Sequence, residues 1–75
     1  MEAYILISLK TADEEEVIDR LKESPKVKEA HILFGEWDII AKLHVQNEQE
    51  LGTFVMEHIR SLESIDLTST LIVAK

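Results

Sequence analysis

Apolar and polar residues alternate in several stretches of the chain, and this pattern predicts four β-strands. Residues 3–9 are rich in β-branched and aromatic side chains, which favour extended backbone. Residues 37–45 and 65–74 alternate at a period of two, as a half-buried strand does. Residues 27–34 are also apolar, but their alternation breaks between positions 30 and 33, where we expect an irregularity such as a β-bulge.

Residues between the first two predicted strands have the spacing of a helix. Thr11 and Glu14 lie three residues apart, as in a capping box, and acidic residues 13–15 suit the positive end of a helix dipole. The helix should run to about Ser24, because Pro25 cannot continue it. Its apolar stripe consists of Val17, Ile18 and Leu21.

A second helix is expected between the last two predicted strands. Asn47 and Glu50 repeat the spacing of a cap followed by an acid, and only Gly52 interrupts the apolar stripe. A glycine inside a helix costs about 1 kcal/mol relative to alanine. The stripe consists of Leu51, Phe54, Val55, Ile59 and Leu62.

The predicted order is therefore strand, helix, strand, strand, helix, strand. Gly35 and Glu36 supply the turn between the two middle strands, which makes them a hairpin. This order is that of an α+β, ferredoxin-like βαββαβ fold, a four-stranded antiparallel sheet with two helices on one face. A chain of 75 residues has room for one hydrophobic core, so we expect residues 1–75 to form one domain.

Two helices can cover one face of such a sheet, and the other face is expected to be apolar as well. The helix-facing set is predicted to be Ile5, Ile7, Leu9, Ile39, Ala41, Leu43, Leu67, Leu71 and Val73. The opposite face would carry Tyr4, Leu6, Ile40, Ile72 and either Phe34 or Leu33. A patch of that size exceeds what a monomer usually exposes, so we predict a homodimer in which a second copy covers it. The alternative is a set of scattered apolar residues, which is normal on soluble proteins.

Charge and composition exclude several partners. The net charge of −7 repels phosphate, so we expect no direct contact with nucleic acid. No stretch approaches the ~20 apolar residues of a membrane span, and we expect no membrane partner. The chain has no cysteine, which excludes disulfides and thiolate zinc sites. We interpret it as a cytoplasmic protein.

Catalytic motifs are absent from the sequence. It contains no cysteine nucleophile, no glycine-rich phosphate loop and no serine-elbow motif, and His31, His44 and His58 lack the spacing of metal ligands. The acidic residues 13–16 are explained by the start of a helix. We therefore predict no catalytic residue, no metal and no cofactor.

The segment Gly35-Glu36-Trp37-Asp38 resembles the G-x-aromatic-D signature between the second and third strands of the Lrp/AsnC effector-binding (RAM) domain. Residues 27–30 precede it at the family's usual distance, and the hydrophobic residues 39–42 follow it. Residues 65–70 resemble the closing T-x-T strand of that family. The resemblance covers essentially the whole chain, and its order and spacing are more specific than any one piece.

The resemblance implies dimers formed through facing sheets, rings of dimers that are commonly octamers, and amino-acid effectors bound between dimers. Full-length members of the family place a helix-turn-helix domain before this module, whereas residues 3–9 already form the first predicted strand here. Any effect on transcription would then be indirect, through co-assembly with full-length Lrp/AsnC regulators.

A free amino acid needs acceptors for its ammonium, donors for its carboxylate and an apolar wall for its side chain. We expect Asp38, with Glu36, to accept from the ammonium, and Trp37 to form part of the wall. Backbone N–H groups near Gly35 and the hydroxyls of Thr68 and Thr70 would donate to the carboxylate, and Gly35 would supply backbone room or a positive φ. In the alternative interpretation Gly35 only makes the turn, Trp37 packs in a core or dimer interface, and Asp38 caps the turn.

The sequence thus favours an amino-acid-binding regulatory module that is not an enzyme. One alternative is a purely structural assembly module whose interface pocket binds nothing. Another is a small ferredoxin-like dimeric enzyme of the monooxygenase type, for which His31 and His44 are the only candidate strand histidines.

Overall fold

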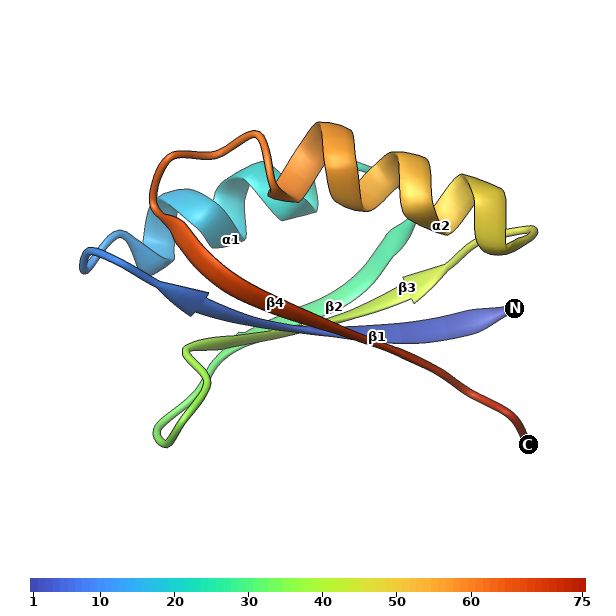
Figure 1. Ribbon diagram of the computed structural model, residues 1–75, viewed down its shortest axis with the longest axis horizontal. Helices are drawn as coiled ribbons and strands as arrows, with labels where there is room; N and C mark the ends of the chain where they lie inside the picture. Colours follow the sequence, from blue (N-terminus) through green and yellow to red (C-terminus); the bar gives the residue numbers. More distant parts are fainter.

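The computed structural model describes residues 1–75 and shows a four-stranded antiparallel sheet with its helices on one face (Figure 1). The strands lie in the order β2-β3-β1-β4. In chain order the elements are β1 (Glu2–Leu9), α1 (Glu14–Lys22), β2 (Val27–Ile32), β3 (Ile39–His44), α2 (Glu48–Phe54), a π-helical segment (Val55–Ile59) and β4 (Ile65–Ile72). The predicted ferredoxin-like fold is confirmed.

The core lies between the sheet and the helices and consists entirely of apolar side chains. Every other residue of β1 and β3 contributes to it, as a two-residue repeat requires. The buried residues are Ala3, Ile5, Ile7, Val17, Ile18, Leu21, Ile39, Ala41, Leu43, Val45, Leu51, Phe54, Ile59 and Ile65. No helix of the chain is both long enough and apolar enough to cross a membrane.

The predicted facing of β4 is wrong over most of its length. Leu67 pairs with Ser8 and Leu71 pairs with Tyr4, so both leucines lie on the face opposite the helices, followed two residues on by Val73. The register shifts between Ser8 and Leu9, and Leu9 pairs with Ile65. This bulge keeps Ile65 in the core but reverses the facing of every later residue.

The helix-facing side of β4 therefore carries Thr68, Thr70 and Ile72 instead of the predicted leucines. Thr68 pairs with Ile7 and Thr70 pairs with Ile5, both of which are buried under the helices. Ile72 had been expected on the opposite face. The strand has apolar residues in both phases, so alternation alone could not decide its orientation.

The hairpin between β2 and β3 also differs in detail from the prediction. The strands end at Ile32 and begin again at Ile39, so six residues connect them, although the Leu33 N–H still donates to the Asp38 carbonyl over 2.8 Å. The irregularity in β2 lies between Val27 and Glu29, earlier than the expected positions 30–33.

One helix start was predicted correctly and one was not. The Asn47 side chain accepts a hydrogen bond from the Glu50 N–H over 2.8 Å and caps α2. No side chain caps α1, whose N-cap residue is Asp13. The Thr11 hydroxyl donates to the Asp13 carboxylate instead of capping a helix, because Thr11 lies one turn ahead of the point where the helix begins.

Candidate functional site

The loop between β2 and β3 bends at Gly35. This residue has φ = +136°, a conformation that side chains other than glycine rarely adopt. A Cβ built on Gly35 would meet no atom within 4 Å. The expected positive φ is confirmed, and backbone conformation, not crowding, requires glycine here.

The substitution Gly35→Ala is expected to destabilise the fold by roughly 1–3 kcal/mol, because the alanine would be held at an unfavourable φ. Gly52 is the matched control, since it also has open space around a built Cβ but lies inside α2. Gly52→Ala should stabilise the chain by about 0.5–1 kcal/mol. Urea unfolding of both variants tests this, and effects of the same sign would contradict it.

Asp38 fastens the other end of this loop to β1. Its Oδ2 atom accepts a hydrogen bond from the Leu9 N–H over 2.7 Å, between residues 29 positions apart. Its own N–H donates to the Ile7 carbonyl over 2.9 Å. The Asp38 carboxylate thus accepts the hydrogen bond of a backbone N–H at the end of β1. This gives Asp38 a structural role in addition to the expected role in ligand binding.

The remaining loop residues present polar and aromatic surface. Glu36 is exposed and Trp37 is half-buried. Phe34, which had been placed on the free sheet face, is instead fully exposed in the loop. Sequence reasoning gave Phe34 no role at this loop, and nothing in its spacing marks the exposure.

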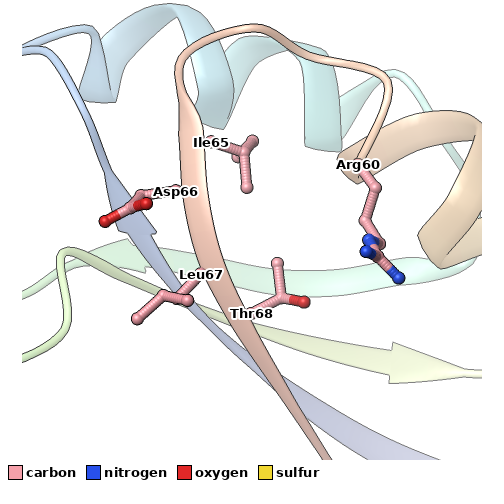
Figure 2. Close-up of a pocket in the computed structure, with 5 residues that line it drawn as sticks. All are labelled: Arg60, Ile65, Asp66, Leu67 and Thr68. Atoms are coloured by element: carbon pink, nitrogen blue, oxygen red, sulfur yellow. The ribbon is translucent and has the colours of Figure 1, made fainter.

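Thr68 and Thr70 lie on the side of β4 that faces the helices, yet beyond the buried Ile65 the helices cover this strand only in part, so that Thr68 is half-buried and Thr70 is exposed. Thr68 lines a groove of about 350 Å³ together with Arg60, Ile65, Asp66 and Leu67 (Figure 2). Thr70 lines a neighbouring groove of about 330 Å³ that also reaches Arg60. Neither hydroxyl takes part in a side-chain hydrogen bond within the chain, so both are available to a ligand.

One chain does not bring the loop and the threonines together. Ile7 of β1 pairs with Ile39 on one side and with Thr68 on the other, so a whole strand separates Asp38 from Thr68. Two strand spacings amount to roughly 9–10 Å. A small ligand that touches both parts would therefore need them to come from different copies of the chain.

The sheet face opposite the helices, which we call the open face, carries apolar residues on β1, on and just after β4, and at the start of β3. Tyr4, Leu6 and Ile40 are half-buried there, and Leu67, Leu71 and Val73 are 61%, 50% and 41% exposed. The predicted patch therefore exists with a different membership, since Leu67 and Leu71 of β4 and Val73 just after it replace Ile72 and Phe34.

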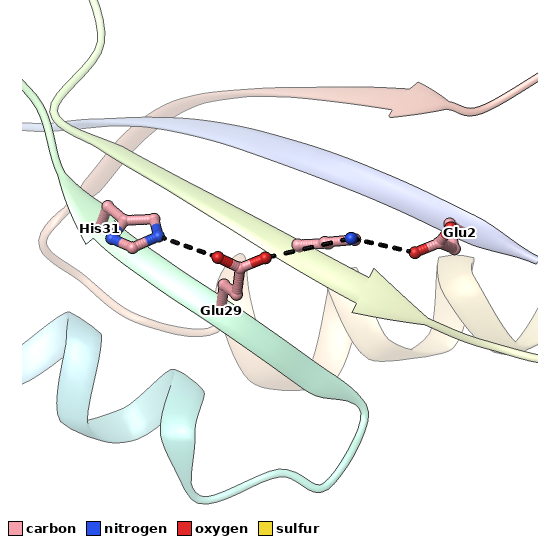
Figure 3. Close-up of polar contacts among 4 residues, drawn as sticks. Glu2, Glu29 and His31 are labelled. Atoms are coloured by element: carbon pink, nitrogen blue, oxygen red, sulfur yellow. Dashed lines mark hydrogen bonds and ion pairs between the residues drawn. The ribbon is translucent and has the colours of Figure 1, made fainter.

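A row of charged residues crosses the open face from Glu2 on β1, through Lys42 on β3, to Glu29 and His31 on β2 (Figure 3). The Lys42 ammonium lies 3.3 Å from Glu2 and 4.0 Å from Glu29, and His31 lies 3.4 Å from Glu29. The hydrogen bond and the charge of Glu2 raise the pKa of Lys42 above its ordinary value. Because Lys42 is exposed enough for solvent to screen its charge, we expect these ion pairs to contribute little to the stability of the fold.

Comparison with known proteins gives consistent results. The family model of the Lrp/AsnC ligand binding domain matches residues 2–75. The HTH-type transcriptional regulator FL11 of Pyrococcus furiosus is 33% identical over 73 residues, which are 97% of this chain and 48% of that protein. The chain spans between 38% and 49% of the length of the regulators from Pyrococcus that it matches over its greater part.

Solved structures resemble this fold closely. A hypothetical protein, PHS023 from Pyrococcus horikoshii, superposes with a TM-score of 0.90 at 36% identity, covering 99% of this chain and 89% of that chain. AsnC of E. coli superposes with a TM-score of 0.91 at 28% identity, covering 99% of this chain and 50% of that chain. The same fold, at 22% identity and a TM-score of 0.86, occurs in the transcriptional regulator NMB0573 of Neisseria meningitidis, solved as an L-Met complex and covered over 49% of its chain.

Proposed function

The chain belongs to the Lrp/AsnC ligand-binding domain family, and we propose that it is a regulatory module that binds a free amino acid and acts through self-assembly. Its relatives are named transcriptional regulators, which favours a regulatory role over an enzymatic one. We propose a cytoplasmic location for this role, because its relatives are named transcriptional regulators.

The open face is the observation that carries this proposal. Leu67, Leu71 and Val73 continue the half-buried surface of Tyr4 and Leu6, and contiguous apolar surface of this kind marks an interaction site. A second copy placed by a two-fold axis would cover it with the same apolar residues. Further contacts between such dimers would build a ring.

The amino-acid site is proposed to lie between copies, where the Gly35–Asp38 loop of one meets the Thr68 and Thr70 hydroxyls of another. Two features support this division: the hydroxyls have no partner within the chain, and β1 separates them from the loop. Glu36 and the free oxygen of Asp38 would accept from the ligand ammonium. A regulator of the same fold was solved with L-Met, which supports an amino acid as the class of ligand.

Full-length Lrp/AsnC regulators are the proposed protein partners. The relatives named HTH-type regulators are longer than this chain and match it in sequence, so the corresponding faces of their matching domains could pair with the open face. Binding of an amino acid would then alter the regulator only if one assembly binds it more tightly than another.

Isothermal titration of the chain with each of the twenty amino acids, followed by sedimentation velocity with and without the ligand, tests this function. We expect one or a few amino acids to release heat and to shift the distribution of assemblies. If none of them produces heat or a shift, free amino acids are excluded as effectors.

A purely structural assembly module is the second candidate, and one observation favours it. The Asp38 carboxylate is already held by the Leu9 N–H, so the signature residue is explained without a ligand. Titration separates the two functions, because the structural candidate predicts a stable assembly that no amino acid changes.

A further inference from the structure

The charged row lies among the apolar residues of the open face that a second copy would cover. Tyr4 and Ile40, which are half-buried there, line a depression of about 70 Å³ together with Glu29, His31 and Lys42. The apolar and the charged side chains thus form one surface. A copy that covers Tyr4 and Ile40 also covers the row.

The row lacks one positive charge. Its fixed charges are two carboxylates and one ammonium, because Lys42 Nζ lies 3.3 Å from Glu2 Oε2 and 4.0 Å from Glu29 Oε2 (Figure 3). The hydrogen bond and the charge of Glu2 raise the pKa of Lys42, so Lys42 stays positive at every pH near neutrality. One negative charge per copy is therefore unbalanced while His31 is neutral.

His31 is the member of the row that can supply the missing charge. Its Nε2 atom lies 3.4 Å from Glu29 Oε1, and histidine is the residue type that ordinarily changes charge near pH 6.5. The other groups beside it in the depression are Tyr4 on β1 and Ile40 and Lys42 on β3, and phenols and ammonium groups ordinarily titrate near or above pH 10. The helices lie on the opposite face of the sheet (Figure 1), so no helix charge faces His31.

Covering the open face changes what the unbalanced charge costs. In one copy the His31 and Glu29 side chains are 61% and 56% exposed, and solvent screens their charges. Under a second copy the same charges lie in a medium of lower dielectric, where an unpaired charge is costly and a matched pair is favoured. A two-fold axis also brings two such rows, each with the same excess of negative charge, to one interface. The covered state therefore binds protons more tightly than the separate copies do.

We propose that pairing through the open face takes up a proton on His31 of each copy, which makes the assembly sensitive to pH between about 6 and 8. By linkage, the state that binds more protons is favoured as the pH falls. Assembly is therefore tighter at pH 6 and weaker at pH 8. This inference rests on the proposed function, because it requires the open face to be covered. It adds a regulatory input that is independent of any amino acid.

Sedimentation equilibrium of the full chain at pH 6, 7 and 8, at constant ionic strength, tests the inference. The dissociation constant of the assembly is expected to rise roughly 5- to 30-fold from pH 6 to pH 8, as for the loss of two partly exposed charge pairs. His31→Gln should remove most of this dependence. His31→Lys keeps a positive charge at all three pH values and should assemble tightly at each of them.

His44→Gln is the matched control. His44 pairs with Glu2 across the strands and lies on the open face at the end of β3, but it is exposed and forms no ion pair. This variant removes the same kind of titratable group from a chain whose net charge is −7, so it reports the effect of overall charge. It should keep the pH dependence of the unmodified chain.

The outcomes distinguish this inference from the proposed function. If the strength of assembly is the same at pH 6 and pH 8, or is lower at pH 6, the inference is wrong and assembly through the open face still stands. A pH dependence that His31→Gln and His44→Gln reduce equally also overturns it, because overall charge then explains the effect. Monomers at every pH would contradict the proposed function as well.

Discussion

The variant Leu71→Glu is expected to be a folded monomer under conditions in which the unmodified chain self-associates. Leu71 is 50% exposed on the open face, so a glutamate there remains in water in a single copy. In a dimer, two leucines lose their burial, and two carboxylates are enclosed without partners. Because Leu71 is already half-buried in a single copy, the first effect alone amounts to roughly 1.5–3 kcal/mol for two copies, or about a 10- to 100-fold rise in Kd.

Ile72→Glu is the matched control for this variant. Ile72 is 47% exposed and lies on the helix side of the same strand. Its substitution therefore introduces the same charge at a position of nearly the same solvent exposure, but on the other face of the sheet. Size-exclusion chromatography with light scattering should show at least dimers for Ile72→Glu and monomers for Leu71→Glu. Loss of dimers in both variants, or in neither, would be inconsistent with pairing through the open face.

The second large effect is expected at Asp38, where stability and ligand binding can be separated. Asp38→Ala removes the acceptor of the Leu9 N–H, and a part-buried donor left unpaired costs about 1–3 kcal/mol. For a domain of this size that corresponds to a fall in Tm of roughly 4–24 °C. Asp38→Asn keeps an oxygen acceptor and should retain most of the stability.

Thermal unfolding and amino-acid titration of both variants provide the measurement. Under the proposed function, Asp38→Asn stays folded and assembled but loses affinity for the effector, because a neutral amide replaces the charged acceptor for the ligand ammonium. Unchanged effector binding by Asp38→Asn would show that the carboxylate serves only the fold. Equal stability of Asp38→Ala and the unmodified chain would show that the bond to Leu9 contributes little.

Much of the fold could be predicted because the facing of the central strands, the start of α2 and the bend at Gly35 each depend on local sequence. Alternation placed the central strands β1 and β3 on the correct face, because their charged and hydroxyl side chains all lie in the phase that faces away from the helices: Glu2, Ser8, Lys42 and His44. Asn47 marked the start of α2, and the positive φ of Gly35 followed from its place in a hairpin. The capping box at Thr11 failed because Asp13 is equally suited to stand ahead of the helix.

The orientation of β4 could not be predicted from alternation. Its sequence is apolar in both phases, with Leu67 and Leu71 in one and Ile72 in the other, and the bulge opposite Ser8 and Leu9 depends on pairing with another strand. The error affects the site, because it places Thr68 and Thr70 on the helix side beside Arg60. Arg60 itself gives no signal in the sequence, since its facing follows from the π-helical segment before it.

The proposed function depends on the open face being covered by another copy of the chain. Sedimentation equilibrium of the unmodified protein at micromolar concentration tests this directly. We predict a mass of at least twice the 8.6 kDa of one chain, in even multiples. A single well-behaved species of 8.6 kDa would contradict it.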